Sequence, residues 1–217
     1  GDFQESMSTV EALSGAAGNE MEILTAKAKE MGATTKFTAQ EASQAMQYMS
    51  MAGWDASAMT AGLGGVMQLA AASGEELGTV SDIVTDALTA FGMTAKDTNQ
   101  FVDILAATAT KSNTNVSMLG ESFKYAAPLC GTLGYSAQDA AVALGLMANS
   151  GIKSSQAGTT LKTALANLSA PTEKQAAVMD DLNISMTNTD GTMKTMMDLT
   201  KNLRSAFSGL SEAEQAS

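Results

Sequence analysis

The hydrophobic pattern in the middle of the chain occurs twice. Residues 77–108, moved forward by 42 positions, align with residues 119–150, so that Leu77 falls on Leu119. Each stretch has apolar positions at helical spacing, then an apolar residue with Gly, a further apolar residue, a Thr or Ser, and a second apolar run. This pattern predicts a unit of two helices joined by a glycine turn, present in two copies.

The junction inside each unit carries residues that end one helix and begin the next. Gly92 and Gly134 suit the left-handed conformation that often terminates a helix. Two positions later, Thr94 and Ser136 can accept hydrogen bonds from the first amides of the following helix. The acidic residues that complete the two caps are Asp97 and Asp139. We therefore expect the same local structure at both junctions.

Similar junctions are predicted at two other places. Gly32 precedes a capping-box pattern formed by Thr38 and Glu41. Gly209 is followed by a second such pattern, at Ser211 and Glu214. Because the four junctions are unevenly spaced, we expect helical hairpins laid side by side rather than a strict solenoid. The predicted fold is mainly α, built from repeated helical hairpins.

The pattern on either side of the repeat predicts further helices. Residues 3–31 should form two helices, and a third should run from the cap at Thr38 to Gly53. Trp54, the single tryptophan, is expected to anchor a corner between helices. Residues 156–168 and 196–207 should also be helical, because their leucines recur at helical spacing.

Three positions modify these expected helices. Ser73 and Asn115 are equivalent residues before the two copies, and both are good helix caps. Pro128 lies inside the second copy, where a bend or a shortened helix is expected because proline lacks a backbone donor.

One short stretch favours β-structure. Alternating residues flank Asp190-Gly191, a pair typical of tight hairpin turns. A small β-hairpin is therefore predicted near residues 183–194.

The elements group into three segments. Residues 1–53 form N-terminal helices, residues 54–170 the repeated helical-hairpin core, and residues 171–217 a helix, the β-hairpin and a helix. We expect one continuous domain excised from a longer chain, because a capping box at Ser211 opens a helix just before Ser217.

Composition narrows the class of protein. The 217 residues are 45% hydrophobic but 5% aromatic, with 16 Met and 19 Gly, so thin helices should pack closely through adaptable side chains. The net charge is −11 and no Lys/Arg cluster offsets it, which argues against binding a nucleic-acid backbone.

Residues 56–74 contain no charged side chain. Their length approaches that of a membrane span, but Ser, Thr, Gln and Gly make the stretch weakly apolar. A central buried helix is the first interpretation, with small residues such as Gly62 and Gly65 allowing close helix contact. A segment that enters a lipid bilayer on release is the second.

Candidate catalytic residues are scarce. The chain has no histidine and one cysteine, Cys130, which aligns with Leu88 in the repeat and is expected to be a small buried residue. The acidic pairs Glu75-Glu76 and Asp180-Asp181 are expected at solvated helix ends. Asp190 lies in a stretch resembling a calcium loop, but methionines occupy the first and twelfth ligand positions. We predict no catalytic, cofactor-binding or metal-binding residues, and no cofactor.

Several long strings resemble the conserved core of bacteriophage tail tape-measure proteins, also called minor tail proteins. They cover nearly the whole chain: residues 33–39, 51–54, 69–75, 83–92, 113–117, 123–128, 145–153 and 207–211, with the pair Asp190-Gly191. The resemblance implies a virion structural protein, made in the bacterial host cytoplasm and located in the virion tail. Such proteins set tail length and leave the tube ahead of the DNA. The expected partners are further copies of the full-length protein and the tail tube, tail tip and tail assembly chaperone proteins, with host membrane contact on ejection.

Two alternatives remain open at this point. One is a helical scaffold or adaptor module that binds a protein partner in a groove between hairpins. The other is a membrane-active segment at Ala56–Gly74 used in host entry.

Overall fold

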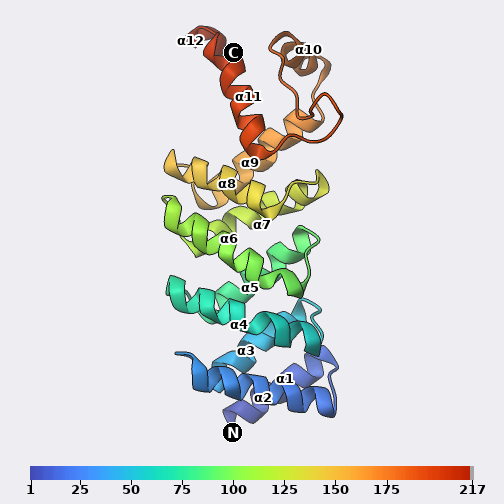
Figure 1. The fold of residues 1–217 in the computed structure, drawn as a ribbon, viewed down its shortest axis with the longest axis vertical. Helices are drawn as coiled ribbons and strands as arrows, with labels where there is room; N and C mark the ends of the chain where they lie inside the picture. Colours follow the sequence, from blue (N-terminus) through green and yellow to red (C-terminus); the bar gives the residue numbers. More distant parts are fainter. Residues whose placement is uncertain (216–217) are drawn as a thin grey trace.

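The computed structural model describes residues 1–215, which form a stack of helices. In chain order these are α1 (Asp2–Ser14), α2 (Asn19–Thr34), α3 (Ala39–Met51), α4 (Ala56–Ser73), α5 (Leu77–Ala90), the 3-10 turn η1 (Ala95–Asp97), α6 (Thr98–Lys111), α7 (Val116–Thr132), α8 (Ala137–Asn149), α9 (Ser154–Ser169), α10 (Glu173–Asp181), α11 (Met196–Ser208) and α12 (Glu212–Gln215). The chain ascends this stack from one end to the other, with the termini at opposite ends (Figure 1).

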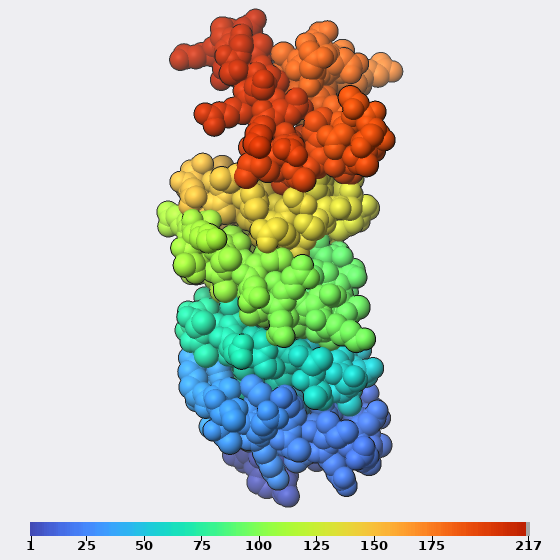
Figure 2. All heavy atoms as spheres, in the orientation of Figure 1, coloured from blue at the N-terminus to red at the C-terminus, as the bar shows by residue number. Residues whose placement is uncertain are grey.

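Helices that alternate along the chain form two columns. In the first column α1, α3, α5, α7 and α9 pack each on the next. In the second column α2, α4, α6 and α8 do the same, and α11 packs on α8. The side chains fill the stack in bands that follow the sequence order (Figure 2). Each hairpin therefore contacts mainly its neighbours, as in a helical repeat protein.

The helices recur at nearly constant spacing. Those of the first column begin at residues 2, 39, 77, 116 and 154, so successive starts are 37 to 39 residues apart. The expectation of uneven spacing was wrong, because it counted junctions at Gly32 and Gly209. Gly32 lies inside α2, and Gly209 has a right-handed φ of −90°, so neither is a junction of the kind found at Gly92 and Gly134. The offset of 42 seen in the sequence arises because α7 has 17 residues and α5 has 14, which displaces the following junction.

Hairpin repeats are thus confirmed, and their junctions share one geometry. The glycines that end the first helix of each hairpin all have positive φ: Gly15 (70°), Gly53 (84°), Gly92 (66°) and Gly134 (81°). At the last three, the next residue donates its amide to a carbonyl five positions back: Trp54 to Met49 at 3.0 Å, Met93 to Leu88 at 2.8 Å and Tyr135 to Cys130 at 2.9 Å. This closure satisfies carbonyls that the helix end would otherwise leave unpaired.

Side-chain caps begin the second half of three of the hairpins, whereas α2 follows Gly18 and has no side-chain cap. Thr94 and Asp97 form the predicted capping box, and Ser136 accepts from the amide of Asp139 at 3.0 Å. Asp55 plays the same part for α4, accepting from Ala58 at 2.8 Å. The capping boxes at Thr38 and at Ser211 are also present. The helix predicted after Ser211 is described as far as Gln215, and its expected course to Ser217 falls outside the described residues.

Small residues set the close approach within the first column. The fifth residue of each helix in this column is small and buried. These residues are Ser6, Ser43, Ser81, Gly120 and Gly158. Ser43 donates to Ser6 at 2.7 Å across α1 and α3. A Cβ at Gly158 would overlap the Ser122 carbonyl oxygen of α7. Larger residues at these positions would push the helices apart.

The core is aliphatic and rich in methionine, with few aromatic anchors. Met46, Met49, Met59 and Met67 are fully buried. Trp54 is buried at the corner between α3 and α4, with its ring against Gly62, as predicted for an anchor. The rings of Phe91 and Phe101 contact that of Phe123 edge-on, at 5.8 and 5.7 Å between centroids.

At helix ends, the expectation for Ser73 was wrong, and so was one of the two alternatives for Pro128, the shortened helix. Asn115 caps α7, accepting from Met118 at 2.7 Å, but its counterpart Ser73 is the last residue of α4 and α5 begins only at Leu77. Pro128 does not shorten α7, which continues to Thr132. The proline is exposed and near the helix end, where one missing hydrogen bond has little effect on the helix.

The predicted β-hairpin near residues 183–194 is not confirmed. The chain reverses there, but within residues 1–215 the pairing is limited to an isolated bridge between Thr187 and Met193. Two backbone hydrogen bonds flank the bridge, from Asn188 to the Thr192 carbonyl and from Lys194 to the Met186 carbonyl, both at 2.8 Å. Lys194 Nζ also donates to the carbonyls of Ser185 at 2.9 Å and Thr187 at 2.6 Å. Asp190 accepts from the amide and hydroxyl of Thr192. Such local bonds compete with strand pairing.

The C-terminal elements leave the two-column pattern. α10 has no buried residue and stands apart from the columns (Figure 1). α11 covers the end of α8 with the buried Met196 and Leu199. Asn202 on α11 holds the loop, accepting from the amide of Ser185 and donating to the carbonyl of Asn183, both at 3.0 Å.

Candidate functional surface

The residues considered for chemistry do not converge on a site. Cys130 is fully buried in α7, and burial raises the pKa of its thiol to about 12. A protonated, inaccessible thiol is a poor nucleophile. Its place matches that of the buried Leu88, as predicted from the repeat.

The acidic pairs lie apart from one another. Glu75 and Glu76 precede α5, whereas Asp180 and Asp181 end α10. Asp190 lies in the loop before α11, where hydrogen bonds from Thr192 lower the pKa of its carboxyl. Among residues 1–215, no three His, Cys, Asp or Glu side chains are grouped as a metal site would require.

The uncharged helix α4 is a structural element of the second column. Its buried face includes Met59, Leu63 and Val66, and Gly62 and Gly65 face the side chains of Trp54 and Asn99. Over the described part of the chain, no helix combines the length and apolar character needed to cross a bilayer.

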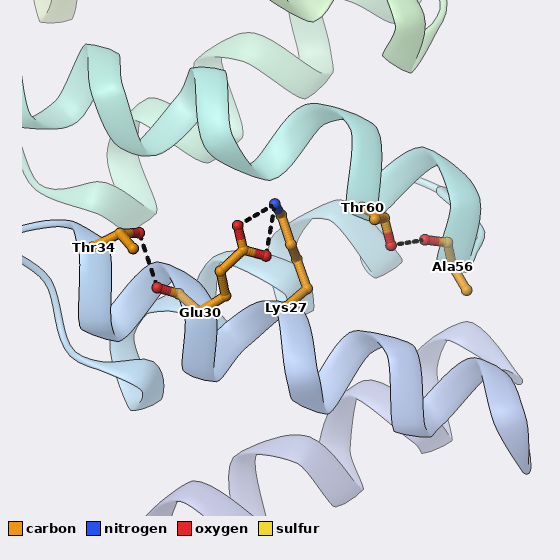
Figure 3. Close-up of polar contacts among 5 residues, drawn as sticks. All are labelled: Lys27, Glu30, Thr34, Ala56 and Thr60. Atoms are coloured by element: carbon orange, nitrogen blue, oxygen red, sulfur yellow. Dashed lines mark hydrogen bonds and ion pairs between the residues drawn. The ribbon is translucent and has the colours of Figure 1, made fainter.

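The ion pairs between described residues are both local. Lys27 pairs with Glu30 at 3.1 Å on α2, and Lys201 with Asp198 at 3.8 Å on α11. Figure 3 shows the first pair beside α4, where the Thr60 hydroxyl bonds to its own helix at Ala56. Apolar and small-residue contacts therefore hold the columns together, and most charges face solvent.

The outward surface of the first column carries a repeated set of exposed positions. The tenth residue of each helix is exposed: Glu11, Tyr48, Asp86, Tyr125 and Thr163. A hollow of about 250 Å³ lies between α5 and α7, lined by Asp82, Asp86, Glu121 and Lys124 among others. Partial burial and then the Asp82 charge raise the pKa of Asp86, against the opposing effect of Lys124.

A larger hollow of about 670 Å³ lies between α3 and α5. Its charged lining consists of Lys36, Glu41, Glu75 and Glu76. Tyr48 and Met51 line it with exposed apolar surface, at 37% and 62% exposure. The hydrophobic periodicity could not locate this hollow or the exposed side chains that line it. The acidic pair Glu75-Glu76 was noticed in the sequence, but not its place beside Tyr48 and Met51.

Charge is distributed unevenly along the stack. Residues 1–93 hold 12 of the 23 acidic residues but 3 of the 12 basic ones. The N-terminal hairpins are therefore strongly acidic, and the basic residues lie toward the C-terminal end. An acidic surface of this kind suits protein partners better than a nucleic-acid backbone.

Comparison with known proteins identifies the family. Residues 25–217 match a family described as "Phage-related minor tail protein". The chain is 35% identical over 214 residues to the "Tape measure protein" of Pneumococcus phage Dp-1, covering 99% of this chain and 19% of that protein. It is 25% identical over 219 residues to the "Probable tape measure protein" of Escherichia phage P2, covering 99% of this chain and 27% of the relative. No solved structure matches the chain.

These relatives are much longer than the chain, which spans about a fifth to a quarter of their lengths. Within that span the similarity runs through all the hairpins of the stack rather than through one motif. The chain belongs to the phage-related minor tail protein family.

Proposed function

We propose that this chain is part of a tape-measure protein, a structural component of a phage tail whose parent protein sets tail length and is released at genome ejection. The observation that carries the proposal is the similarity over 99% of the chain to two proteins with that name. The stack fits an assembly role, because its conspicuous surfaces are hollows between helices rather than a group of reactive side chains.

The packing suits a protein that is assembled in one arrangement and later rearranged. Helix contacts depend on methionine, alanine and glycine, and the ion pairs are local. Methionine-rich contacts adapt to altered packing with less loss than rigid aromatic ones. The proposed partners are other copies of the full-length protein, together with the tail tube, tail tip and tail assembly chaperone proteins, and we propose that the domain acts without catalysis.

Deletions in the parent phage test the proposal. In-frame deletions in the helical regions outside residues 1–217 should shorten tails in proportion to the residues removed, as measured by electron microscopy. A phage carrying point substitutions in the same region, with the length unchanged, serves as the control and should keep normal tails. Tails of unchanged length after the deletions would contradict the tape-measure role and favour a helical adaptor.

A further inference from the structure

We propose that the hollow between α3 and α5 receives the exposed face of α11 from a second copy of this chain. The proposal deepens the self-association included in the proposed function by naming the two surfaces that meet. Its test uses purified chain in solution, so it succeeds or fails separately from the tail-length experiment.

The lining of the hollow combines acidic side chains with a smaller share of apolar surface. Glu41, Glu75 and Glu76 contribute three carboxylates, against the single cation of Lys36. The Lys36 ammonium lies 5.0 Å from the centroid of the Phe37 ring and is already engaged there. In the same lining, the Tyr48 ring lies against Gly78, at 3.0 Å from where a Cβ would stand. An occupant of complementary chemistry combines cations with apolar side chains.

The exposed face of α11 has that chemistry. Its inner face is used, because Met196 and Leu199 are buried against α8. Its outer face presents Met197, Lys201 and Arg204, which share one side of a helix at spacings of three and four residues. Phe207 adjoins them, and both it and Met197 are 41% exposed.

The charges on this face are available for a partner. The ion pair between Lys201 and Asp198 is long, at 3.8 Å, and the two side chains are 70% and 56% exposed. Such a pair contributes little to stability, so little is lost when Lys201 turns to a partner. Arg204 forms no ion pair with a described residue. A planar guanidinium can bind a carboxylate in a bidentate manner and stack on a tyrosine ring.

The two surfaces cannot meet within one molecule. The hollow lies between the second and third helices of the first column, and α11 lies at the far end of the stack, beyond α7 and α9 (Figure 1). Contact therefore joins different copies, each contributing a different surface. Unless the copies close into a reciprocal pair or a ring, this contact leaves one hollow and one α11 free at the ends, and association continues beyond a dimer.

Salt alone is a poor probe of this contact. Salt weakens the attraction between the two patches, but it also screens the mutual repulsion of chains that each carry a net charge of −11. Charge reversal separates the two effects, because it changes one surface at a time.

Two double variants provide the test. Glu75→Lys with Glu76→Lys reverses the hollow, and Lys201→Glu with Arg204→Glu reverses α11. Sedimentation equilibrium should show that the wild-type mass rises with concentration and that each variant alone associates at least about tenfold more weakly. An equimolar mixture of the variants should associate again, because each then meets an opposite charge on the other.

A matched control reverses an acidic pair outside the hollow. Asp180→Lys with Asp181→Lys makes the same change of charge at the end of α10 and should associate at least as strongly as wild type. Circular dichroism melting checks that all variants fold. Monomeric wild-type chain at the highest soluble concentration, variants that associate as wild type does, or a mixture that stays monomeric would each overturn the proposal.

Discussion

Gly92 and Gly134 end the first helices of consecutive hairpins with φ values of 66° and 81°, and no neighbouring atom lies within 4 Å of an added Cβ at either. A side chain there would not clash with a neighbour, so any loss of stability would come from the left-handed backbone conformation. Replacing either glycine with Val should lower the free energy of unfolding by about 1–3 kcal/mol, because β-branched residues strongly disfavour this conformation.

Denaturant unfolding of both variants measures that cost. Asn tolerates the left-handed region, so Gly134→Asn is the matched control and should lose clearly less stability than Gly134→Val. Equal losses for Asn and Val would show that space rather than backbone conformation limits the site. Wild-type stability for both Val variants would refute the shared junction.

Tyr135 follows the second of these glycines and is 4% exposed, yet its hydroxyl has no hydrogen-bond partner among the described residues. A buried hydroxyl without a partner has lost its water without replacement. Tyr135→Phe should therefore leave the free energy of unfolding unchanged or raise it by up to about 1 kcal/mol. A loss of stability in urea titrations would show that the hydroxyl has a partner, such as a buried water.

Cys130 predicts how stability depends on alkaline pH. Burial raises the pKa of its thiol to about 12 in the folded chain, while the unfolded thiol loses its proton at the ordinary lower pH. Between these two values the unfolded state binds fewer protons, so the free energy of unfolding should fall as pH rises. Below the ordinary thiol pKa the residue should have no pH effect.

Urea unfolding at about pH 8 and about pH 10 tests this, with Cys130→Ala as the comparison. The alanine variant should be less stable at the lower pH, because of the cavity, but should lose less on going to the higher pH. In the alanine variant the free energy of unfolding should still fall somewhat between the two pH values, because burial also raises the pKa of Tyr135. Identical slopes for both chains would contradict the assigned thiol pKa.

Helix stacking depends on where glycine meets a neighbour. At Gly158 in α9, an added Cβ would overlap the backbone of Ser122 in α7. At Gly64 in α4, the nearest contact of an added Cβ is the flexible end of Met31, at 4.0 Å. Gly158→Ala should therefore cost about 1–3 kcal/mol through overpacking. Gly64→Ala should stabilise by about 0.5–1 kcal/mol, because alanine is the better helix former.

Thermal melting of the two alanine variants measures both changes in stability, which are expected to have opposite signs although the substitution is the same. Because the substitution is identical, intrinsic helix propensity cancels between them. If both variants gained stability, α7 and α9 would not approach as closely as the Gly158 contact requires.

The elements that the sequence predicted well are those specified by local chemistry. Gly92, Gly134 and their caps act within a few residues, so their pattern identified the hairpin without knowledge of its neighbours. The register of the stack was missed because the longer α7 displaces its junction by three residues. The same junction at Gly53 and Trp54 is visible in the sequence, and aligning it first would have given the regular spacing.

The elements that were wrong depend on competing contacts. Alternation around Asp190-Gly191 predicted strand pairing, but the pairing does not extend beyond the Thr187–Met193 bridge, and the turn is closed by side-chain bonds from Thr192 to Asp190. Ser73 has the chemistry of a helix N-cap, but it is the last residue of the preceding helix, α4. The hollow between α3 and α5 could not be predicted, because it forms between elements whose relative register the sequence left open.

At the scale of the whole molecule, contacts join mainly adjacent hairpins. Each inner helix of the first column packs on the one before and the one after, and the columns end differently. α1 closes one end and exposes Asp2, Glu5 and Glu11, while the other end carries α10, which has no buried residue. Stability in such a stack is the sum of local and neighbouring terms, so it should vary along the chain.

Amide hydrogen exchange should show that variation. Protection should be greatest in α5 to α7, which have packed neighbours on both sides, and smaller in α1, which has one. α10 and the turn at residues 187–192 should exchange fastest, because α10 has no buried residue and the turn residues are exposed. Mass spectrometry of peptides, with rates corrected for those of the unfolded chain, makes the comparison. Uniform protection from α1 to α10 would mean that the stack unfolds as one cooperative unit, and neighbour-by-neighbour stability would then be the wrong description of this fold.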